Sequence, residues 1–257
     1  MSEALRAYLR RRPWSFSLWR YSELVPLRAL EFPEPLLDLG CGDGLFASIL
    51  FAGRAGTVGV DSFRPSLELA RRSGAYRALA GADVTALPFR DASFATVFSN
   101  CVVEHLDDPT SAFAEVRRVL RPGGHFVFTV PSERFKELLF WPRVLSRLGL
   151  RALATRYGEM INGLLAQKHL LPASRWRELL AAAGLRALRL QPYASPRVAA
   201  LFDAGIPIAV PAFLLREITS RWHVLPKPAL AGRLIERAVG DGLPREGAGL
   251  LIEAARE

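Results

Sequence analysis

The chain has 257 residues, half of them hydrophobic, which suits one α/β domain with an elaboration or two small domains. Only two cysteines occur, Cys41 and Cys101, so a disulfide framework and a Cys/His zinc site are excluded, no metal is predicted, and a reducing, cytoplasmic compartment is expected. The net charge is +9, but the arginines are scattered, which favours a general arginine bias over a nucleic-acid groove and leaves attraction to an anionic membrane open.

Between residues 36 and 130 the sequence alternates between short apolar runs and segments with helical periodicity. The pattern predicts strands over 36–39, 57–60, 76–80, 94–99 and 125–130, and helices over 45–52, 65–73 and 109–120. Residues 121–124 (RPGG) are expected to end the last of these helices, because proline and glycine commonly follow a helix end. Such alternation predicts a parallel sheet with helices on both faces and a ligand site at the carboxyl ends of the strands.

The remaining segments are expected to elaborate this sheet. A helix over 173–183, a strand over 185–192 and a last strand over 247–254 would complete it. Residues 1–33 read as helical and lack the long apolar core of a signal peptide. The connection after the fifth strand, with helical patches over 134–148 and 150–166, is too long for a plain loop and is interpreted as a lid. The predicted organisation is an N-terminal helical cap (1–33), the first half of the sheet (34–131), the lid (132–172), a helix and sixth strand (173–193), an insert (194–244) and the last strand (245–257).

The insert of residues 194–244 is apolar and rich in proline. Residues 198–215 are nearly continuous apolar sequence, in which Asp203, Pro207 and Pro211 are expected as breaks, so no bilayer-crossing helix is predicted. The arginines that follow, with Trp222 among them, are Arg216, Arg221, Arg233 and Arg237. Two interpretations stay open: a cap that buries its apolar face, or an interfacial hairpin with arginine and tryptophan at the level of lipid headgroups.

The sequence LLDLGCGDG at residues 36–44 places three glycines within five positions, directly after the first strand. Glycine is costly to order, so the cluster indicates a sharp turn or a close approach to a ligand. The third glycine of a dinucleotide fingerprint would fall at Leu45, and no Gly-Lys-Ser/Thr of a P-loop follows. The alternatives are a ligand without a diphosphate, such as one with an amino-acid moiety, and a tight turn that binds nothing.

Residues 38–44 (DLGCGDG) resemble the first motif of the class I S-adenosylmethionine-dependent methyltransferases at every position. Residues 81–89, 94–100, 104–106 and 120–124 resemble later family motifs in the same order, in the pattern of the small-molecule subgroup that includes quinone-pathway methyltransferases. The resemblance covers residues 35–131. It implies that the predicted segment 34–131 is the cofactor-binding half of a Rossmann-like domain. It implies a doubly wound, mostly parallel, seven-stranded Rossmann-like α/β sheet with the N-terminal helical cap, the lid after strand 5, and the helical insert between strands 6 and 7.

The resemblance also implies S-adenosyl-L-methionine as cofactor and S-adenosyl-L-homocysteine as product. Asp38 and the turn residues Gly40, Cys41, Gly42 and Gly44 would receive the amino-acid moiety. Asp61 would accept hydrogen bonds from both ribose hydroxyls, with Ser62 beside it. Asp83 would meet the adenine amino group, Val84 would offer a backbone N–H to the ring, and Asn100 and His105 would complete the cofactor site after the fourth strand.

The catalytic residue is left open. A methyl group on a sulfonium is already electrophilic, so positioning of the acceptor can supply most of the rate, and a base is needed only for a hydroxyl or a carbon acid. The candidates are His105, His169 and Tyr157. The alternative for His105 is packing on the cofactor, and for His169 and Tyr157 it is packing or solvation within the lid.

We expect methyl transfer by in-line attack to a small acceptor, apolar, lipid-like or aromatic, held by the cap, lid and insert. A peripheral membrane contact stays open, and no oligomeric state is predicted. A methyltransferase acting on RNA or protein is the second hypothesis; the charge favours it, but residues 99–102 (SNCV) lack an N/D-P-P-Y-type motif, so nucleic acid is not the expected partner. A non-catalytic relative that binds the cofactor or a membrane is the third, and the intact motifs count against it.

Overall fold

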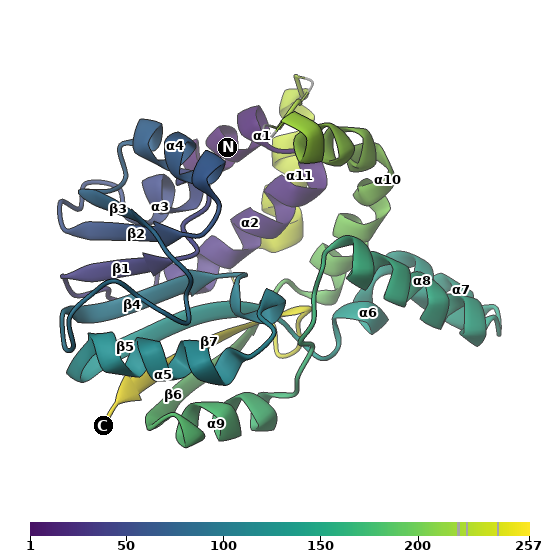
Figure 1. Ribbon diagram of the computed structural model, residues 1–257. Coiled ribbons are helices and arrows are strands. Elements are labelled where there is room, and N and C mark those ends of the chain that lie inside the picture. Colours follow the sequence, from purple (N-terminus) through teal and green to yellow (C-terminus); the bar gives the residue numbers. More distant parts are fainter. Residues whose placement is uncertain (220–221, 225, 241) are drawn as a thin grey trace. The chain divides into compact units, whose positions relative to one another are not determined.

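The structure is a computed structural model that describes residues 1–219, 222–224, 226–240 and 242–257 (Figure 1). Arg221, one of the arginines noted in the insert, lies outside the described residues. The chain divides into two compact units. Unit 1 comprises residues 1–27, 132–167 and 192–249, and unit 2 comprises residues 28–131, 168–191 and 250–257.

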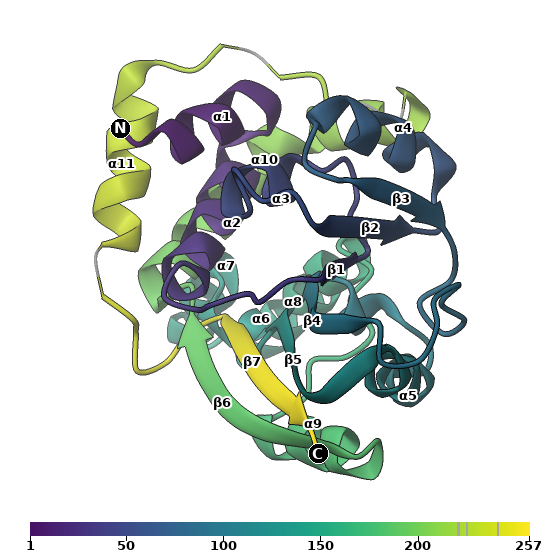
Figure 2. The same ribbon diagram turned by 90° about the vertical axis from the view of Figure 1, so that its left-hand side faces the viewer.

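Unit 2 is built on a seven-stranded sheet with the strand order β3-β2-β1-β4-β5-β7-β6. The strands are β1 (Leu36–Leu39), β2 (Thr57–Asp61), β3 (Ala78–Gly81), β4 (Phe94–Asn100), β5 (Leu120–Pro131), β6 (Leu185–Tyr193) and β7 (Gly249–Arg256). The first five strands pair in parallel, and β6 and β7 run in opposite directions beside them (Figure 2). The predicted doubly wound, mostly parallel, seven-stranded sheet is confirmed.

Helices cover both faces of this sheet. They are α3 (Leu45–Leu50), α4 (Arg64–Ser73), η1 (Val103–His105), α5 (Pro109–Val119) and α9 (Ala173–Ala182). In β4, Val97 and Phe98 are both buried although they point to opposite faces, as expected of a strand covered on both sides. The ring of Phe98 lies 5.2 Å from that of Phe51. The ring of Phe128 in β5 lies 5.8 Å from that of Trp176 in α9.

Two expected boundaries in unit 2 are wrong. Residues 121–124 belong to β5 rather than to a turn before it, but they bulge out of the ladder, because Phe94 pairs with Leu120 whereas Thr96 pairs with His125. Proline cannot donate to a ladder, and Gly123 has a φ of +73°, so this stretch cannot pair regularly. Tyr76, expected in the third strand, precedes β3.

Unit 1 is helical and combines three stretches that are far apart in the sequence. Its helices are α1 (Glu3–Arg11), α2 (Trp14–Leu27), α6 (Phe135–Leu138), α7 (Phe140–Arg147), α8 (Arg151–Leu164), α10 (Pro196–Thr219) and α11 (Ala229–Val239). Trp19 of α2 has ring contacts with Phe135 at 5.6 Å, Tyr193 at 5.9 Å and Phe202 at 5.1 Å. The cap, lid and insert therefore share one aromatic core.

Helix α10 corrects the expectation that prolines break the insert. The helix runs unbroken through Pro207 and Pro211, and both prolines lie on its exposed side, where water can hydrate the carbonyl groups that they leave without a donor. By length and composition Pro196–Arg216 could cross a membrane; about a third of the most apolar window is buried, and core helices of globular proteins meet the same criterion.

A buried carboxylate on α10 ties two helices of the lid to the insert. Asp203 is fully buried and accepts hydrogen bonds from the backbone N–H of Trp141 at 3.0 Å and from the Tyr157 hydroxyl at 2.7 Å. It also accepts from the backbone N–H of Phe140, the first residue of α7. Burial raises the pKa of Asp203, and these hydrogen bonds oppose the rise. Asp203 thus caps the start of α7 from a neighbouring helix and holds α8 at Tyr157.

The substitution Asp203→Ala should lower the free energy of unfolding by about 3 kcal/mol, because two N–H groups and one hydroxyl would lose a buried acceptor. Tyr157→Phe should cost only about 1 kcal/mol, because a single hydrogen bond disappears. Urea unfolding followed by circular dichroism measures both values. Equal losses in the two variants would contradict the capping role of the carboxylate.

Candidate active site

The carboxyl ends of β1 to β4 meet at one edge of the sheet in unit 2. The register places Leu39 beside Val60 and Ser99, and Asp61 beside Gly81. The glycine turn, Asp83 and Asn100 follow these positions, and Asp61 is itself the last residue of β2. The parallel sheet therefore gathers the residues predicted to hold a cofactor along one line, although they span more than sixty positions of sequence.

The three glycines of the turn have different reasons to be glycine. All have positive φ values, +73° at Gly40, +55° at Gly42 and +75° at Gly44. A Cβ at Gly40 would lie 2.4 Å from the Val102 side chain, and one at Gly44 would lie 2.5 Å from Ser73 Oγ. A Cβ at Gly42 would meet no atom within 4 Å. Packing thus accounts for Gly40 and Gly44, whereas Gly42 faces open space that a ligand can enter.

Asp61 stabilises the turn and remains able to accept more hydrogen bonds. Its Oδ2 accepts from the backbone N–H of Gly42 at 2.8 Å, and its Oδ1 accepts from the N–H of Phe63 at 2.8 Å. A carboxylate has about four lone-pair sites, so each oxygen can accept a second donor. Ser62 is exposed beside it, and the Phe63 side chain is 52% exposed, which is unusual for a large aromatic residue.

Asp83 is exposed after β3 and is held in a fixed orientation. Its Oδ1 accepts from the backbone N–H of Thr85 at 2.8 Å and from the Thr85 hydroxyl at 2.7 Å. These bonds lower the pKa of Asp83, so the side chain is ionised at neutral pH. Both bonds go to one oxygen, which leaves the lone pairs of Oδ2 for an external donor. Val84, the next residue, is buried.

Asp38 lies beneath the turn rather than open to solvent. It is 4% exposed, and the Tyr76 hydroxyl donates to its Oδ2 at 2.6 Å. The same hydroxyl lies 3.4 Å from the carbonyl oxygen of Cys41, a buried turn residue. Burial raises the pKa of Asp38 to about 7, the hydrogen bond from Tyr76 opposes the rise, and the charge of Asp61 adds to it. The floor of the turn thus contains a carboxylate that titrates near neutral pH.

The end of β4 supplies a second group of polar atoms. Asn100 Oδ1 accepts from the Thr129 hydroxyl at 2.7 Å, and the Cys101 N–H donates to the Thr129 carbonyl at 3.0 Å. Cys101 has a φ of +52°, a strained conformation for a residue with a side chain. Such strain gathers at functional sites, where the surrounding contacts enforce it.

His105 and His169 come to the same turn of unit 2. The Glu104 carbonyl accepts from the N–H groups of Lys168 at 2.8 Å and His169 at 3.2 Å, and His169 Nε2 donates to the Leu106 carbonyl at 2.9 Å. His105 is half-exposed, with its Nε2 3.8 Å from Oε1 of the buried Glu104. Tyr157, the third catalytic candidate, lies on α8 in unit 1, where its hydroxyl donates to Asp203.

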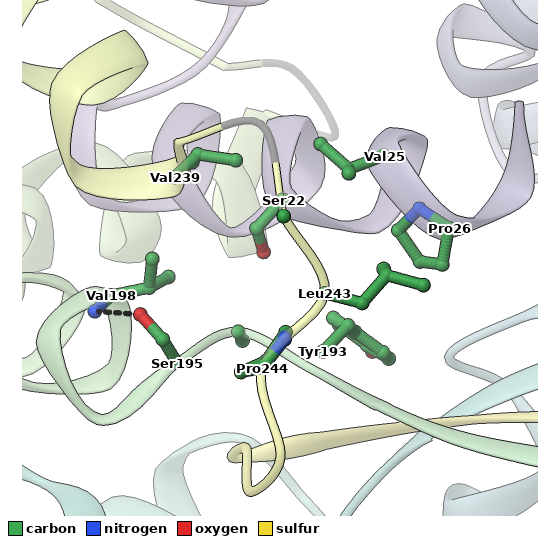
Figure 3. Close-up of a pocket in the computed structure, with 11 residues that line it drawn as sticks. Ser22, Val25, Pro26, Tyr193, Ser195, Val198, Val239, Leu243 and Pro244 are labelled. Carbon is green, nitrogen blue, oxygen red and sulfur yellow. Dashed lines mark hydrogen bonds between the residues drawn. The ribbon is translucent and has the colours of Figure 1, made fainter.

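Unit 1 contains a small hollow that opens to solvent, with a cavity volume of about 20 Å³, which is room for about one water molecule. Figure 3 shows Ser22, Val25 and Pro26 of α2 across from Leu243 and Pro244. The lining is mostly apolar and is completed by Tyr193, Ala194, Ser195, Val198, Val239 and Gly242. The hydroxyl of Tyr193 donates to the buried Glu23, and Glu23 also pairs with Arg20 at 2.9 Å. The hollow therefore lies between the cap and the insert, above a satisfied polar pair.

Residues 37–128 match the family model of a methyltransferase domain. A malonyl-(acyl-carrier protein) O-methyltransferase from Erwinia pyrifoliae is 36% identical over 111 residues, which cover 41% of this chain and 42% of that protein. A ubiquinone biosynthesis O-methyltransferase from Alkalilimnicola ehrlichii is 31% identical over 115 residues, 41% of this chain and 44% of that protein. The chain thus spans less than half the length of these relatives.

Solved structures extend the likeness over nearly the whole chain, at low identity. A SAM-dependent methyltransferase from Thermotoga maritima has a TM-score of 0.58 at 18% identity and covers 95% of this chain and 91% of that one. The cyclase SpnF has a TM-score of 0.57 at 22% identity and covers 92% of this chain and 80% of that one. These likenesses show the fold.

The family predicted from the motifs is confirmed where the motifs lie. Residues 37–128 form a methyltransferase domain. The matched segment lies wholly within unit 2. The roles of individual residues remain predictions.

The sequence did not predict Tyr76 and Phe63 as residues of this candidate site. The ring of Tyr76 passes over Gly59, where a Cβ would lie 3.0 Å from it, and Gly59 pairs with Asp38 in the sheet. Glycine inside a strand marks a close approach of another group, so Gly59 was the available signal for Tyr76. Phe63 was recognisable only as the residue two positions after the strand-end acid.

Protonation of Asp38 should make the stability of the protein depend on pH. The carboxyl has a pKa of 3.8 when unfolded and about 7 when folded, so between these values the folded state binds more protons and stability falls as pH rises. The loss from pH 5 to pH 7.5 should be about 2.5 kcal/mol greater for the natural chain than for Asp38→Asn, which keeps an acceptor for Tyr76. Urea unfolding at several pH values measures it, and parallel stability curves would contradict the assignment.

Proposed function

We propose that this protein transfers the methyl group of S-adenosylmethionine to a small apolar acceptor. The observation that carries the proposal is the glycine turn, in which Gly42 faces open space between the buried Asp38 and the half-exposed Asp61. The turn belongs to the segment that matches a methyltransferase domain. If the turn bound no ligand, a side chain at position 42 would displace nothing. The positive φ at Gly42 would then be the remaining reason for glycine at this position.

The residues at this edge fit the cofactor. The turn at residues 40–44 would receive the amino-acid moiety, with the carboxylate of Asp38 beneath its ammonium. Asp61 would accept from the ribose hydroxyls, and Asp83 Oδ2 from the adenine amino group. The exposed ring of Phe63 would pack against the base, since an aromatic side chain gains most where it is shielded from water.

When bound, S-adenosylmethionine supplies an electrophilic methyl group, and the protein supplies alignment and a proton acceptor. His105 is the residue best placed to take a proton from an acceptor hydroxyl, since it is half-exposed as the last residue of η1 and the buried Glu104 carboxylate lies 3.8 Å from its Nε2. His169 donates from Nε2 to the Leu106 carbonyl, so its Nδ1 is the remaining acceptor. His169 would hold η1, and with it His105, in place.

Unit 1 would determine the acceptor. None of its three stretches overlaps the segment matched to the family model, and all three contribute apolar side chains to its core. The apolar side chains of these stretches support an apolar acceptor portion, whereas the hollow beside α2, at about 20 Å³, is too small to hold one. Two relatives of the domain are named as O-methyltransferases, so an acceptor oxygen is the first to test. We propose a cytoplasmic location, as the low cysteine content of the sequence predicts.

The purified protein should transfer label from methyl-labelled S-adenosylmethionine to the lipid or small-metabolite fraction of a host-cell extract. Heat-inactivated protein is the control. Label in the RNA or protein fraction would contradict the small acceptor. Cofactor binding without any transfer would contradict the activity, an outcome that matters because a cyclase shares this fold.

The substitution Gly42→Ala should weaken binding of S-adenosylmethionine at least tenfold, because its methyl would enter the space reserved for the ligand. Gly53→Ala is the matched control. Gly53 also has positive φ, at +81°, and a Cβ at this position would likewise meet no atom within 4 Å, but Gly53 lies after α3. Both variants should lose about 1 kcal/mol of stability from the strained φ. Titration calorimetry measures the affinity, and equal affinities in the two variants would contradict the cradle.

A further inference from the structure

The turn between α7 and α8 in unit 1 exposes leucines where a surface turn is normally polar. Residues 147–151 read Arg-Leu-Gly-Leu-Arg, and the Leu148 side chain is 68% exposed and that of Leu150 is 45% exposed. Leu153, one turn into α8, is 50% exposed. Single exposed leucines are ordinary. Three together at the tip of a helical hairpin form an apolar patch, and the exposure of such a patch to water is unfavourable.

The tip is rigidly built. The N–H of Leu150 donates to the Leu145 carbonyl at 2.9 Å, and that of Gly149 donates to the Ser146 carbonyl at 3.1 Å. With a φ of +79° at Gly149, this pair of bonds is a Schellman motif that closes α7. The two helices pack side by side up to the turn (Figure 1). The leucines are therefore presented in a fixed arrangement, and little ordering entropy remains to be lost when they are buried.

The charge around the tip has one sign. Between Glu137 and Glu159 the sequence contains no acid and four arginines, Arg143, Arg147, Arg151 and Arg156. Among the described residues none of these arginines has an ion-pair partner, whereas the flanking acids do: Glu159 pairs with Lys136 at 2.6 Å and Glu137 with Arg134 at 3.7 Å. Arg147 and Arg151 directly bracket the leucines and are exposed.

We propose that the α7–α8 tip, residues 147–153, docks on an anionic lipid surface. Leu148, Leu150 and Leu153 would enter the acyl boundary, and the bracketing arginines would meet the headgroup phosphates. A second copy of this chain fits less well, because its own four arginines would face these four. A nucleic acid would satisfy the arginines but would leave the leucines in water.

Sedimentation with vesicles tests the proposal without any need for cofactor or activity. The full chain should bind vesicles that contain about one-third phosphatidylglycerol in phosphatidylcholine, and should bind pure phosphatidylcholine vesicles far less. Leu148→Ser with Leu150→Ser should lower the partition coefficient about a hundredfold, tenfold for each leucine. Arg147→Gln with Arg151→Gln should lower it about twentyfold, and NaCl at about 0.5 M should abolish that difference.

Two matched variants complete the test. Arg177→Gln with Leu188→Ser removes one exposed arginine and one exposed leucine from unit 2 and should bind like the natural chain. Ile208→Ser with Ile218→Ser removes the most exposed apolar residues of α10, 85% and 82% exposed, and should also bind like the natural chain. Lost binding in the α10 variant alone would overturn the proposal and make the insert the docking element.

Two other results would overturn it as well. One is the absence of vesicle binding by the natural chain, or binding that the leucine variant retains in full. The other is a dimer of the natural chain in sedimentation velocity that the leucine variant converts to monomer without a change in vesicle binding. Circular dichroism of each variant confirms that the fold is intact; the tip side chains are exposed, so their replacement should leave it so.

Discussion

The arrangement of the candidate site depends on the burial of one carboxylate. Asp38 is 4% exposed, and in that environment its charged form is costly unless a donor reaches it. The donor is Tyr76, whose ring passes over Gly59, the β2 residue opposite Asp38; a Cβ there would lie 3.0 Å from the ring and 2.7 Å from Leu79. The requirement to satisfy Asp38 thus fixes β1, β2 and the segment before β3 relative to one another. The turn at residues 40–44 and Asp61 lie above that floor, joined by the bond from the Gly42 N–H to Asp61.

The cofactor edge was predictable because its signals are local. Strand-end acids, a glycine cluster and apolar runs occupy contiguous stretches, and parallel pairing brings their ends together without further information. Contacts between distant stretches were not predictable in the same way. Tyr76 read as a strand residue because an aromatic side chain before an apolar run has strand propensity, and its partner lies 38 positions earlier. Thr129 meets Asn100 for the same tertiary reason.

The helical half shows where local rules were overridden. Pro207 and Pro211 were expected to divide the insert, but both lie on the exposed side of α10, where hydration replaces the lost hydrogen bonds. Asp203 was expected to break the apolar run of residues 198–215 as well, because it places a charge within that run. It is instead the acceptor for the start of α7, a role that exists only once three distant stretches have come together. Packing of the opposite face then outweighs the propensity of single residues.

The two units differ in how much of their sequence is shared with the methyltransferase family. Every residue matched to the methyltransferase family lies in unit 2, and the chemistry of a sulfonium methyl demands little of the protein beyond alignment. A fold that also supports a cyclase cannot by itself specify the reaction, so specificity has to come from side chains outside the shared segment. Unit 1 contains the apolar core, the hollow beside α2 and the arginine-bracketed leucine tip, none of which the cofactor edge requires. The proposed apolar acceptor and the proposed lipid surface would both be met by apolar side chains of unit 1.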